Sequence, residues 1–269
     1  GASLGKADYV TTLVVGDVIG QPGCRALFSL LPGAIRATGA HFVIVNGENA
    51  ADGFGLNPEQ VGQFFQAGAN VITSGNHIWH REELFRTLDQ EQRLLRPHNY
   101  PKSNPGHGYG VYEVRGNKVG VINLQGRYRM KPIDCPFRGS REAVRAVKKD
   151  TKLIFVDFHA EDTEEKESLG LYLDGEVTAI FGTHTHVATA DERVLPKGTA
   201  YITDIGATGP VDSVIGFNPA ISVERALTQM PLRNEVAEGK AALHGVVITA
   251  DADSGRARSI ERYRAESSV

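Results

Sequence analysis

The sequence has few cysteines. Cys24 and Cys135 are the only two among the 269 residues, and neither belongs to a Cys-x-x-Cys pair. A disulfide framework or a zinc site built from thiolates needs more cysteines at closer spacing, so both are excluded. Any metal that the protein holds must therefore be bound through nitrogen and oxygen atoms.

The sequence also lacks long apolar runs and a large net charge. No apolar run approaches the roughly 20 residues that span a bilayer. Lys+Arg number 29 and Asp+Glu 32, so the net charge is −3 and no basic domain of the nucleic-acid-binding kind is present. Since no signal-type apolar stretch lies near the start, we expect a soluble, cytoplasmic protein. We expect one domain over residues 1–269, with residues 1–8 a flexible or vector-derived start.

What the sequence does contain is an alternation of β-branched runs and amphipathic stretches. Strands are predicted at residues 11–15, 41–45, 70–74, 118–124, 152–158, 177–181 and 199–203. Helical patterns occupy residues 24–39, 58–68 and 80–90. The final stretch predicts a β-hairpin that turns at residues 253–255. Strands that alternate with helices indicate a layered α/β fold, to which the hairpin adds antiparallel strands.

Polar side chains follow several of these strands at the point where each strand ends. Parallel strands place their carboxyl ends at one edge of a sheet, and ligands bind in the crevice outside that edge. These polar residues are therefore expected to converge on one rim, although they are far apart in the sequence. They are Asp17, Glu48, Asn49, Asn76, His77, His159, His184 and His186.

The types of these residues indicate a metal site. Two carboxylates, two amides and up to four imidazoles suit iron, manganese, zinc or another transition metal better than calcium or magnesium. So many donors exceed one tetrahedral site and suit two metals that share a carboxylate. Two metals roughly 3.5–4 Å apart can clamp the attacking and leaving oxygens of a phosphoryl displacement.

The ordered motifs resemble those of the calcineurin-like metallophosphoesterases, and in detail those of the YmdB-type bacterial branch. GD at 16–17, GEN at 47–49, GNH at 75–77, the isolated His159 and GTHTH at 182–186 carry the first likeness. Longer stretches such as VVGDVIGQPG, FVIVNGENAADGFGL and YITDIGATGPVDSVIG carry the second. The resemblance runs from about residue 11 to the terminal hairpin. It implies a four-layer α/β/β/α sandwich of mixed β-sheets flanked by helices.

The resemblance also implies a role for each residue at the rim. Asp17, Glu48 and His186 would hold one metal, and Glu48 would bridge to a second held by Asn76, His159 and His184. The superfamily usually has a D-x-H motif at the first position, whereas this chain has Asp17-Val18-Ile19, so Asn49 is the substitute donor. An amide oxygen is a harder ligand than an imidazole, which favours iron or manganese, with zinc or magnesium as alternatives.

The activity implied is hydrolysis of small phosphodiesters, 2′,3′-cyclic nucleotides such as 2′,3′-cyclic AMP being favoured. A metal-bridging hydroxide would attack, and His77 would protonate the leaving group as a general acid. A broad-specificity phosphatase or nuclease on the same site is one alternative. A metal-dependent nucleotide-binding regulatory protein with little turnover is another. The resemblance further implies a homodimer or homotetramer.

Residues near the rim have weaker signals. Arg127 and Arg129 follow a predicted strand and are candidate contacts to the substrate phosphate, although a solvated loop is the commoner explanation for such residues. Asp157 should point to the opposite face of its strand from His159 and so support the site instead of ligating. Asp204 also follows a strand, and we predict that it orients a ligand histidine through the second ring nitrogen.

Overall fold

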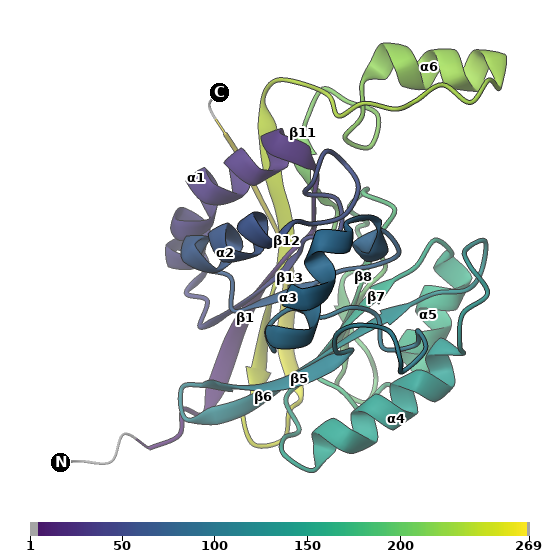
Figure 1. Ribbon diagram of the computed structural model, residues 1–269. Helices are drawn as coiled ribbons and strands as arrows, with labels where there is room; N and C mark the ends of the chain where they lie inside the picture. The colour runs from purple at the N-terminus through teal and green to yellow at the C-terminus, as the bar shows by residue number, and fades with distance from the viewer. Residues whose placement is uncertain (1–4, 268–269) are drawn as a thin grey trace.

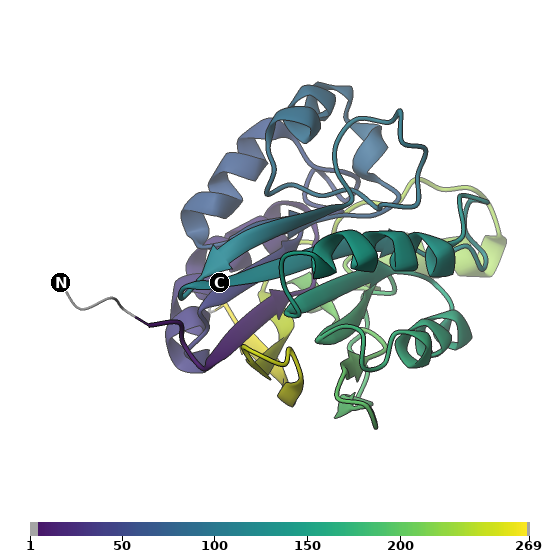
Figure 2. The same cartoon turned by 90° about the horizontal axis from the view of Figure 1, so that it is seen from below.

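Two β-sheets pack face to face, and helices cover the outer side of each (Figures 1 and 2). The computed structural model describes residues 5–267. The strands are β1 (Tyr9–Val15), β2 (Asp17–Val18), β3 (Phe42–Asn46), β4 (Val71–Thr73), β5 (Tyr109–Val114), β6 (Asn117–Gln125), β7 (Ile154–His159), β8 (Ala179–Thr183), β9 (Arg193–Val194), β10 (Ala200–Ile202), β11 (Ala207–Pro210), β12 (Ala241–Asp251) and β13 (Ala257–Glu266). The helices are α1 (Gly20–Thr38), α2 (Pro58–Ala67), α3 (Phe85–Gln90), α4 (Pro136–Lys148), α5 (Thr163–Tyr172) and α6 (Pro219–Thr228), with short 3₁₀ turns at Ile78–His80 and Glu82–Leu84.

The hydrophobic core consists of three clusters of buried side chains, which lie between the four layers of the fold. Val14 and Phe42 of one sheet meet Phe155 and Phe181 of the other, all at most 1% exposed. A second cluster joins the outer face of the first sheet to α1 and α2, and a third joins the second sheet to α4 and α5. The predicted four-layer α/β/β/α arrangement is therefore confirmed.

The order of the strands places many carboxyl ends on the same side. The seven-stranded sheet runs β2-β11-β12-β1-β3-β4, with β13 also paired to β12, and β1, β3 and β4 are parallel. The six-stranded sheet runs β5-β6-β7-β8-β10-β9, and β6, β7, β8 and β10 are parallel. The terminal hairpin forms as predicted, from β12 and β13. Both parallel sets turn their carboxyl ends toward the predicted rim.

Two helical predictions differ in their bounds from the structure. The first helix begins at Gly20, before Pro22, because a proline in the first helical turn loses no hydrogen bond. The stretch 80–90 is not one helix: Arg81 is extended (φ −112°, ψ 98°) and separates the 3₁₀ turn at Ile78–His80 from the one at Glu82–Leu84, which runs directly into the short helix α3. The interruption follows directly on the polar segment that contains Asn76 and His77.

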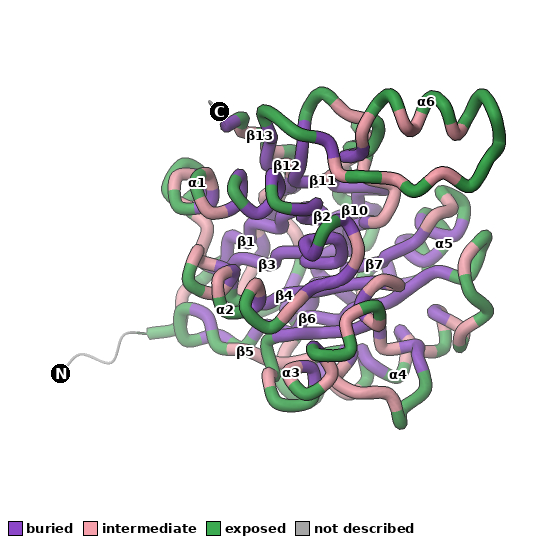
Figure 3. Tube along the Cα trace, turned by 45° about the horizontal axis from the view of Figure 1, so that its top comes forward, coloured by how far each residue is buried: buried purple, intermediate pink, exposed green. Residues whose placement is uncertain are grey.

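One segment stands away from the layered body. Helix α6 projects from the top of the molecule in Figure 1, and it contains no buried residue. Figure 3 shows the helix and the strand-free segment after it as mostly exposed.

The remaining expectations concern membrane spans, cellular location, the number of domains and the start of the chain. Within residues 5–267, no helix is both long and apolar enough to cross a membrane. Cytoplasmic location and the single domain over 1–269 stay predictions. Of the predicted flexible start, residues 1–4 lie outside the described residues. Ala7 and Asp8 make backbone hydrogen bonds to Arg115 and Ala252.

Candidate metal centre

The predicted ligands lie where the carboxyl ends of the two sheets meet. In the seven-stranded sheet they follow β1, β3 and β4, and in the six-stranded sheet they end β7 or follow β8. Asp17, Glu48 and His159 are completely buried. The structure brings together Asp17, Glu48, Asn49, Asn76, His159, His184 and His186, whose contacts form two groups.

The first group surrounds the Nε2 atom of His159. This nitrogen lies 3.0 Å from Glu48 Oε2, 3.1 Å from Asn76 Oδ1 and 3.2 Å from His184 Nδ1. A ring nitrogen carries at most one proton, so the three contacts cannot all be hydrogen bonds. Donors that share a first-row metal at about 2.1 Å lie about 3.0–3.4 Å from one another. The spacing is that of ligands around one cation.

The proton of His159 can be assigned from its other ring nitrogen. The prediction that Asp157 points to the opposite face from His159 is wrong, because residues two apart on a strand share a face and both side chains contact Thr183. Asp157 is a buried carboxylate that accepts hydrogen bonds from Asn46 and Thr73. Its other oxygen accepts from Thr183 Oγ1 at 2.7 Å, which uses the single hydroxyl proton of Thr183. Thr183 Oγ1 therefore accepts from His159 Nδ1 at 2.9 Å, and His159 Nε2 presents a lone pair. Burial lowers the pKa of His159 to about 4, which keeps the imidazole neutral.

His184 is oriented in the same way by Glu161. The Nε2 atom of His184 lies 2.9 Å from Glu161 Oε2, so it carries the proton and Nδ1 is left with a lone pair. Burial lowers the pKa of His184 to about 3. The lone pairs of His184 and His159 thus face each other, beside the oxygens of Glu48 and Asn76. Such an arrangement repels itself unless a cation lies between the donors.

The second group contains Asp17, Asn49 and His186. Both carboxylate oxygens of Asp17 are buried without a hydrogen bond, and the 3.4 Å contact to His186 Nε2 is an ion-pair distance only. Burial raises the pKa of Asp17, but the surrounding imidazoles outweigh burial and bring the pKa down to about 2. His186 donates its Nδ1 proton to the carbonyl oxygen of Ile215 at 2.9 Å, and its Nε2 faces the Asp17 carboxylate, whose charge outweighs burial and raises the pKa of His186. An ionised, buried carboxylate without donors is costly unless a cation is bound.

Asn49 links the second group to His77. Its Oδ1 lies 2.8 Å from His77 Nδ1, and its Nδ2 lies 3.0 Å from His186 Nε2. The oxygen and nitrogen of an amide can be exchanged by a half-turn of the side chain. With the oxygen toward His186, the amide nitrogen donates to His77 Nδ1, and the proton of neutral His77 lies on Nε2.

The donor chemistry of both groups fits a divalent metal. Within residues 5–267, no three His, Cys, Asp or Glu side chains form a metal-binding group by themselves. The amide groups of Asn76 and Asn49 lie against His159 and His186 and are the further candidate donors in each group. The unsatisfied oxygens of Asp17 and the converging lone pairs around His159 are the observations that support this fit.

His77 lies at the edge of the groups, not within the donor set around His159. Its backbone nitrogen donates to both oxygens of Glu48, at 2.9 and 3.0 Å, and its side chain is 23% exposed. The ring meets Phe54 edge-on at 5.1 Å, and Phe54 in turn stacks on Phe217. Burial lowers the pKa of His77. The residue is held in position at the site and keeps part of its ring accessible.

The loop with the two candidate arginines lies beside β7. Gly126 donates its backbone proton to the carbonyl oxygen of His159, and buried Glu165 accepts from the backbone nitrogens of Arg127 and Tyr128. The side chain of Arg129 makes an exposed ion pair with Asp162 at 3.0 Å. Arg127 stays a candidate contact to substrate, whereas Arg129 already has a carboxylate partner.

The prediction that Asp204 orients a ligand histidine is wrong. Asp204 accepts hydrogen bonds from Thr185 and Lys166 and makes none to a ligand histidine. Other groups orient these histidines: the carbonyl oxygen of Ile215 contacts His186, and the carboxylate of Glu161 contacts His184. The sequence pattern did not indicate that Glu161, Thr183 and Lys166 support the site. For Glu161 the available signal was the motif FHAE at 158–161, which places it two residues after His159.

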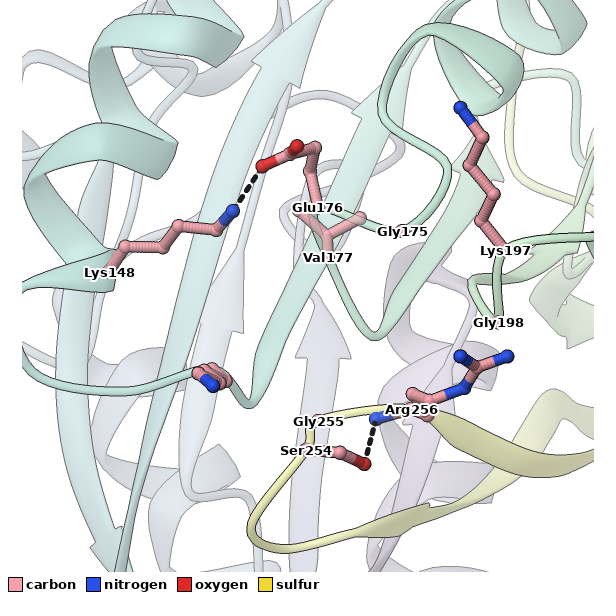
Figure 4. A pocket seen from close by; sticks show the side chains of 10 residues that line it. Lys148, Gly175, Glu176, Val177, Lys197, Gly198, Ser254, Gly255 and Arg256 are labelled. Carbon is pink, nitrogen blue, oxygen red and sulfur yellow. Dashed lines mark hydrogen bonds and ion pairs between the residues drawn. The ribbon is translucent and has the colours of Figure 1, made fainter.

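A basic cavity lies elsewhere, at the amino ends of the second sheet's strands. It has a volume of about 320 Å³ and is lined by Lys148, Lys152, Lys197 and Arg256, with Glu176 paired to Lys148 (Figure 4). These residues precede β7, β8 and β10 or lie in the terminal hairpin. The cavity contains none of the candidate ligands.

Comparison with known proteins identifies the family. Residues 13–263 match the family model described as YmdB-like protein. This chain belongs to the YmdB-like family. It is 46% identical over 250 residues to a Bacillus subtilis protein named 2′,3′-cyclic-nucleotide 2′-phosphodiesterase. The alignment covers 93% of this chain and 95% of that protein.

Solved structures agree with the YmdB-like assignment. A structure from Mycoplasma pneumoniae titled a novel phosphatase has a TM-score of 0.90 and 37% identity, covering 96% of this chain and 94% of that one. A 5′-nucleotidase from Candida albicans shares the fold alone, with a TM-score of 0.54 and 14% identity over 97% of this chain and 52% of that one. The resemblance to the YmdB-type branch and its calcineurin-like sandwich is therefore confirmed.

Proposed function

We propose that this protein is a metal-dependent phosphodiesterase that hydrolyses small phosphodiesters, in particular 2′,3′-cyclic nucleotides such as 2′,3′-cyclic AMP. The observation that carries the proposal is the convergence of donor atoms from Glu48, Asn76 and His184 around His159 Nε2, beside the unsatisfied carboxylate of Asp17. The Bacillus subtilis relative, whose name states a 2′,3′-cyclic-nucleotide phosphodiesterase activity, supports the choice of substrate.

Two divalent cations would be held by the two groups. Asp17, Asn49 and His186 would hold one, while Asn76, His159 and His184 would hold the other, with Glu48 shared between them. Iron or manganese suits this mixture of hard oxygens and imidazoles, and no thiolate competes for a softer metal. When bound, the cations supply Lewis acidity and a water molecule acidified for attack on phosphorus.

The protein's own charges suit a phosphodiester. Two divalent cations carry +4, and the carboxylates of Asp17 and Glu48 reduce this to +2. A singly charged phosphodiester and one hydroxide equivalent then balance the site. Arg127 would add a contact to a phosphate oxygen from the loop beside β7.

His77 would supply the proton that the leaving alkoxide needs. Its backbone is fixed by Glu48 and its Nδ1 by Asn49, so the ring is held at the edge of the metal groups. When the oxygen of Asn49 faces His186, the proton of neutral His77 lies on Nε2. This nitrogen can donate without a prior protonation of the ring, which matters because burial lowers the pKa of His77.

The experiment that tests the function compares the wild type with Glu48→Gln. We expect near two iron or manganese atoms per chain by elemental analysis, together with hydrolysis of 2′,3′-cyclic AMP and of a bis-aryl phosphodiester. Both metal content and hydrolysis should fall sharply in the variant. Binding of cyclic nucleotide without product would indicate a regulatory binding protein, and preference for phosphomonoesters would indicate a phosphatase. No metal and no activity after adding Mn²⁺ or Fe²⁺ would overturn the proposal.

We also propose that the protein forms a homodimer or homotetramer. Helix α6 projects from the body and exposes Val223 by 53% and Leu227 by 79%, one helical turn apart on the same face. Ile215 and Met230, at the two ends of the same projection, are each 48% exposed. Exposed apolar side chains gathered on one projection suit contact with another copy of the chain.

A further inference from the structure

The segment that carries two of the candidate ligands has an unusual backbone. His184 has a φ of 98° and His186 a φ of 70°, in the left-handed region that glycine normally occupies. One of these histidines belongs to each metal group, and only Thr185 lies between them. Residues with side chains keep such a conformation only where surrounding structure imposes it. The contacts of Thr185 are therefore the place to look for that constraint.

Asp204 holds Thr185 through its backbone and its side chain. The Oδ2 atom of Asp204 accepts from Thr185 N at 3.1 Å and from Thr185 Oγ1 at 2.7 Å. Its Oδ1 atom accepts from Gly206 N at 2.8 Å, which fixes the carboxylate to its own loop. The carbonyl oxygen of Asp204 accepts from Thr189 N, beyond the other end of the segment. Asp204 thus anchors the segment at Thr185, in its middle, and at Thr189, just after its end.

Lys166 supplies the charge that keeps this carboxylate in place. It reaches from α5, and its Nζ lies 3.2 Å from Asp204 Oδ2, with the side chains 1% and 0% exposed. Every other lysine or arginine ion pair within residues 5–267 has an exposed partner. Gly182 makes room for the pair, since a Cβ there would lie 3.0 Å from Lys166 Cε and 1.7 Å from Thr203 O. A buried charge pair is tolerated where hydrogen bonds satisfy both members.

We propose that the Lys166–Asp204 pair is a positioning device that imposes the left-handed backbone of His184 and His186 and so presets one ligand in each metal group. This inference rests on the proposed metal sites and adds the residues that organise them. Neither Lys166 nor Asp204 touches the donor groups; both act through Thr185. Loss of the pair should therefore weaken both metal sites together.

The test measures Mn²⁺ affinity and stoichiometry by titration, using the full chain. Lys166→Met removes the buried ammonium, and Thr185→Val removes the hydroxyl hydrogen bond while keeping size and backbone. Each should weaken Mn²⁺ binding at both sites by about tenfold or more, the range seen when groups supporting metal ligands are removed. Lys148→Met is the matched control, since it removes a lysine ion pair that lies far from the site.

A second readout does not depend on metal. Amide hydrogen exchange of residues 183–187 in the metal-free protein should become faster in Lys166→Met and Thr185→Val than in the wild type and the control. If exchange and Mn²⁺ affinity are unchanged while the melting temperature falls, the pair only stabilises the fold and the inference is wrong. If the wild type binds no Mn²⁺ but exchange responds as expected, positioning stands and the proposed function fails. If Lys166→Met does not fold, the exchange rates and Mn²⁺ affinity of Thr185→Val test the inference instead.

Discussion

The smallest scale at which the site can be tested is the single side chain of His77. The residue follows the candidate ligand Asn76, yet its ring contacts Asn49 and Phe54 at the edge of the site. Its backbone nitrogen is hydrogen-bonded to Glu48 at 2.9 and 3.0 Å, and its ring Nδ1 lies 3.4 Å from Glu48 Oε2. Ligation and proton transfer are thus assigned to neighbouring residues of one short segment.

We predict that His77→Ala keeps its metal but loses proton transfer. Hydrolysis of 2′,3′-cyclic AMP, which has a poor leaving group, should fall by about 10²–10⁴-fold. Hydrolysis of a bis-aryl phosphodiester should fall much less, because an aryloxide leaves without a proton. Steady-state kinetics on both substrates, with elemental analysis of the same samples, measures this. Equal losses on the two substrates would speak against the acid role.

At the residue scale, the sequence predicted the donors better than the groups that orient them. Asp17, Glu48, Asn76 and His159 follow strands, and the end of a strand is a local signal. The partners of the histidines come from other segments: Glu161 for His184 and the Ile215 carbonyl for His186. No pattern in one sequence pairs such positions, and for that reason the predicted partner of Asp204 was wrong.

At the scale of elements, the turns that leave the strands decide how closely the donors approach. Gly75, in the turn after β4, has no room for a side chain. A Cβ there would lie 2.1 Å from His159 Cδ2 and 2.3 Å from His159 Nε2. The turn therefore packs directly on the ring of the candidate ligand His159, which lies on a strand of the other sheet.

We predict that Gly75→Ala displaces His159 and loses the metal held by Asn76, His159 and His184. The matched control is Gly62→Ala, at an exposed position of helix α2, where a Cβ meets nothing within 4 Å. The control should keep full metal content and gain up to about 1 kcal/mol of stability, because alanine favours the helix. Elemental analysis and thermal unfolding of both variants decide the point. Full metal content in Gly75→Ala would show that the ring does not ligate.

The elements themselves were predictable to different degrees. The buried parallel strands and the terminal hairpin follow from β-branched runs and a turn sequence, and all of them form. The stretch 80–90 is helical in pattern but is interrupted at Arg81, whose guanidinium donates to the carbonyl oxygens of Ala51 and Phe54. A long-range contact outweighs the local preference there. The left-handed backbone of His184 and His186 is likewise imposed from outside the segment.

At the scale of the whole molecule, the layered body and the α6 projection differ in how their apolar residues are covered. The body buries its apolar residues in three clusters between layers. Helix α6 has no such partner among residues 5–267, and its apolar side chains Val223 and Leu227 are exposed. The projection leaves the body next to the site, because Ile215 binds His186 and Phe217 stacks on Phe54. Contact between copies through α6 would therefore lie close to the rim.

We predict that Leu227→Asp lowers the molecular mass in solution from that of an oligomer toward that of one chain. A charge placed on the exposed apolar face loses favourable burial in the contact and costs desolvation, whereas the isolated chain accepts it because the position is 79% exposed. Glu224→Gln, an exposed change on the same helix, should leave the mass unaltered. Light scattering after size-exclusion chromatography measures the mass, and thermal unfolding checks that the layered body is intact. A wild type that is already a single chain, or an oligomer that survives Leu227→Asp, would remove α6 from the contact and leave its exposed face without this explanation.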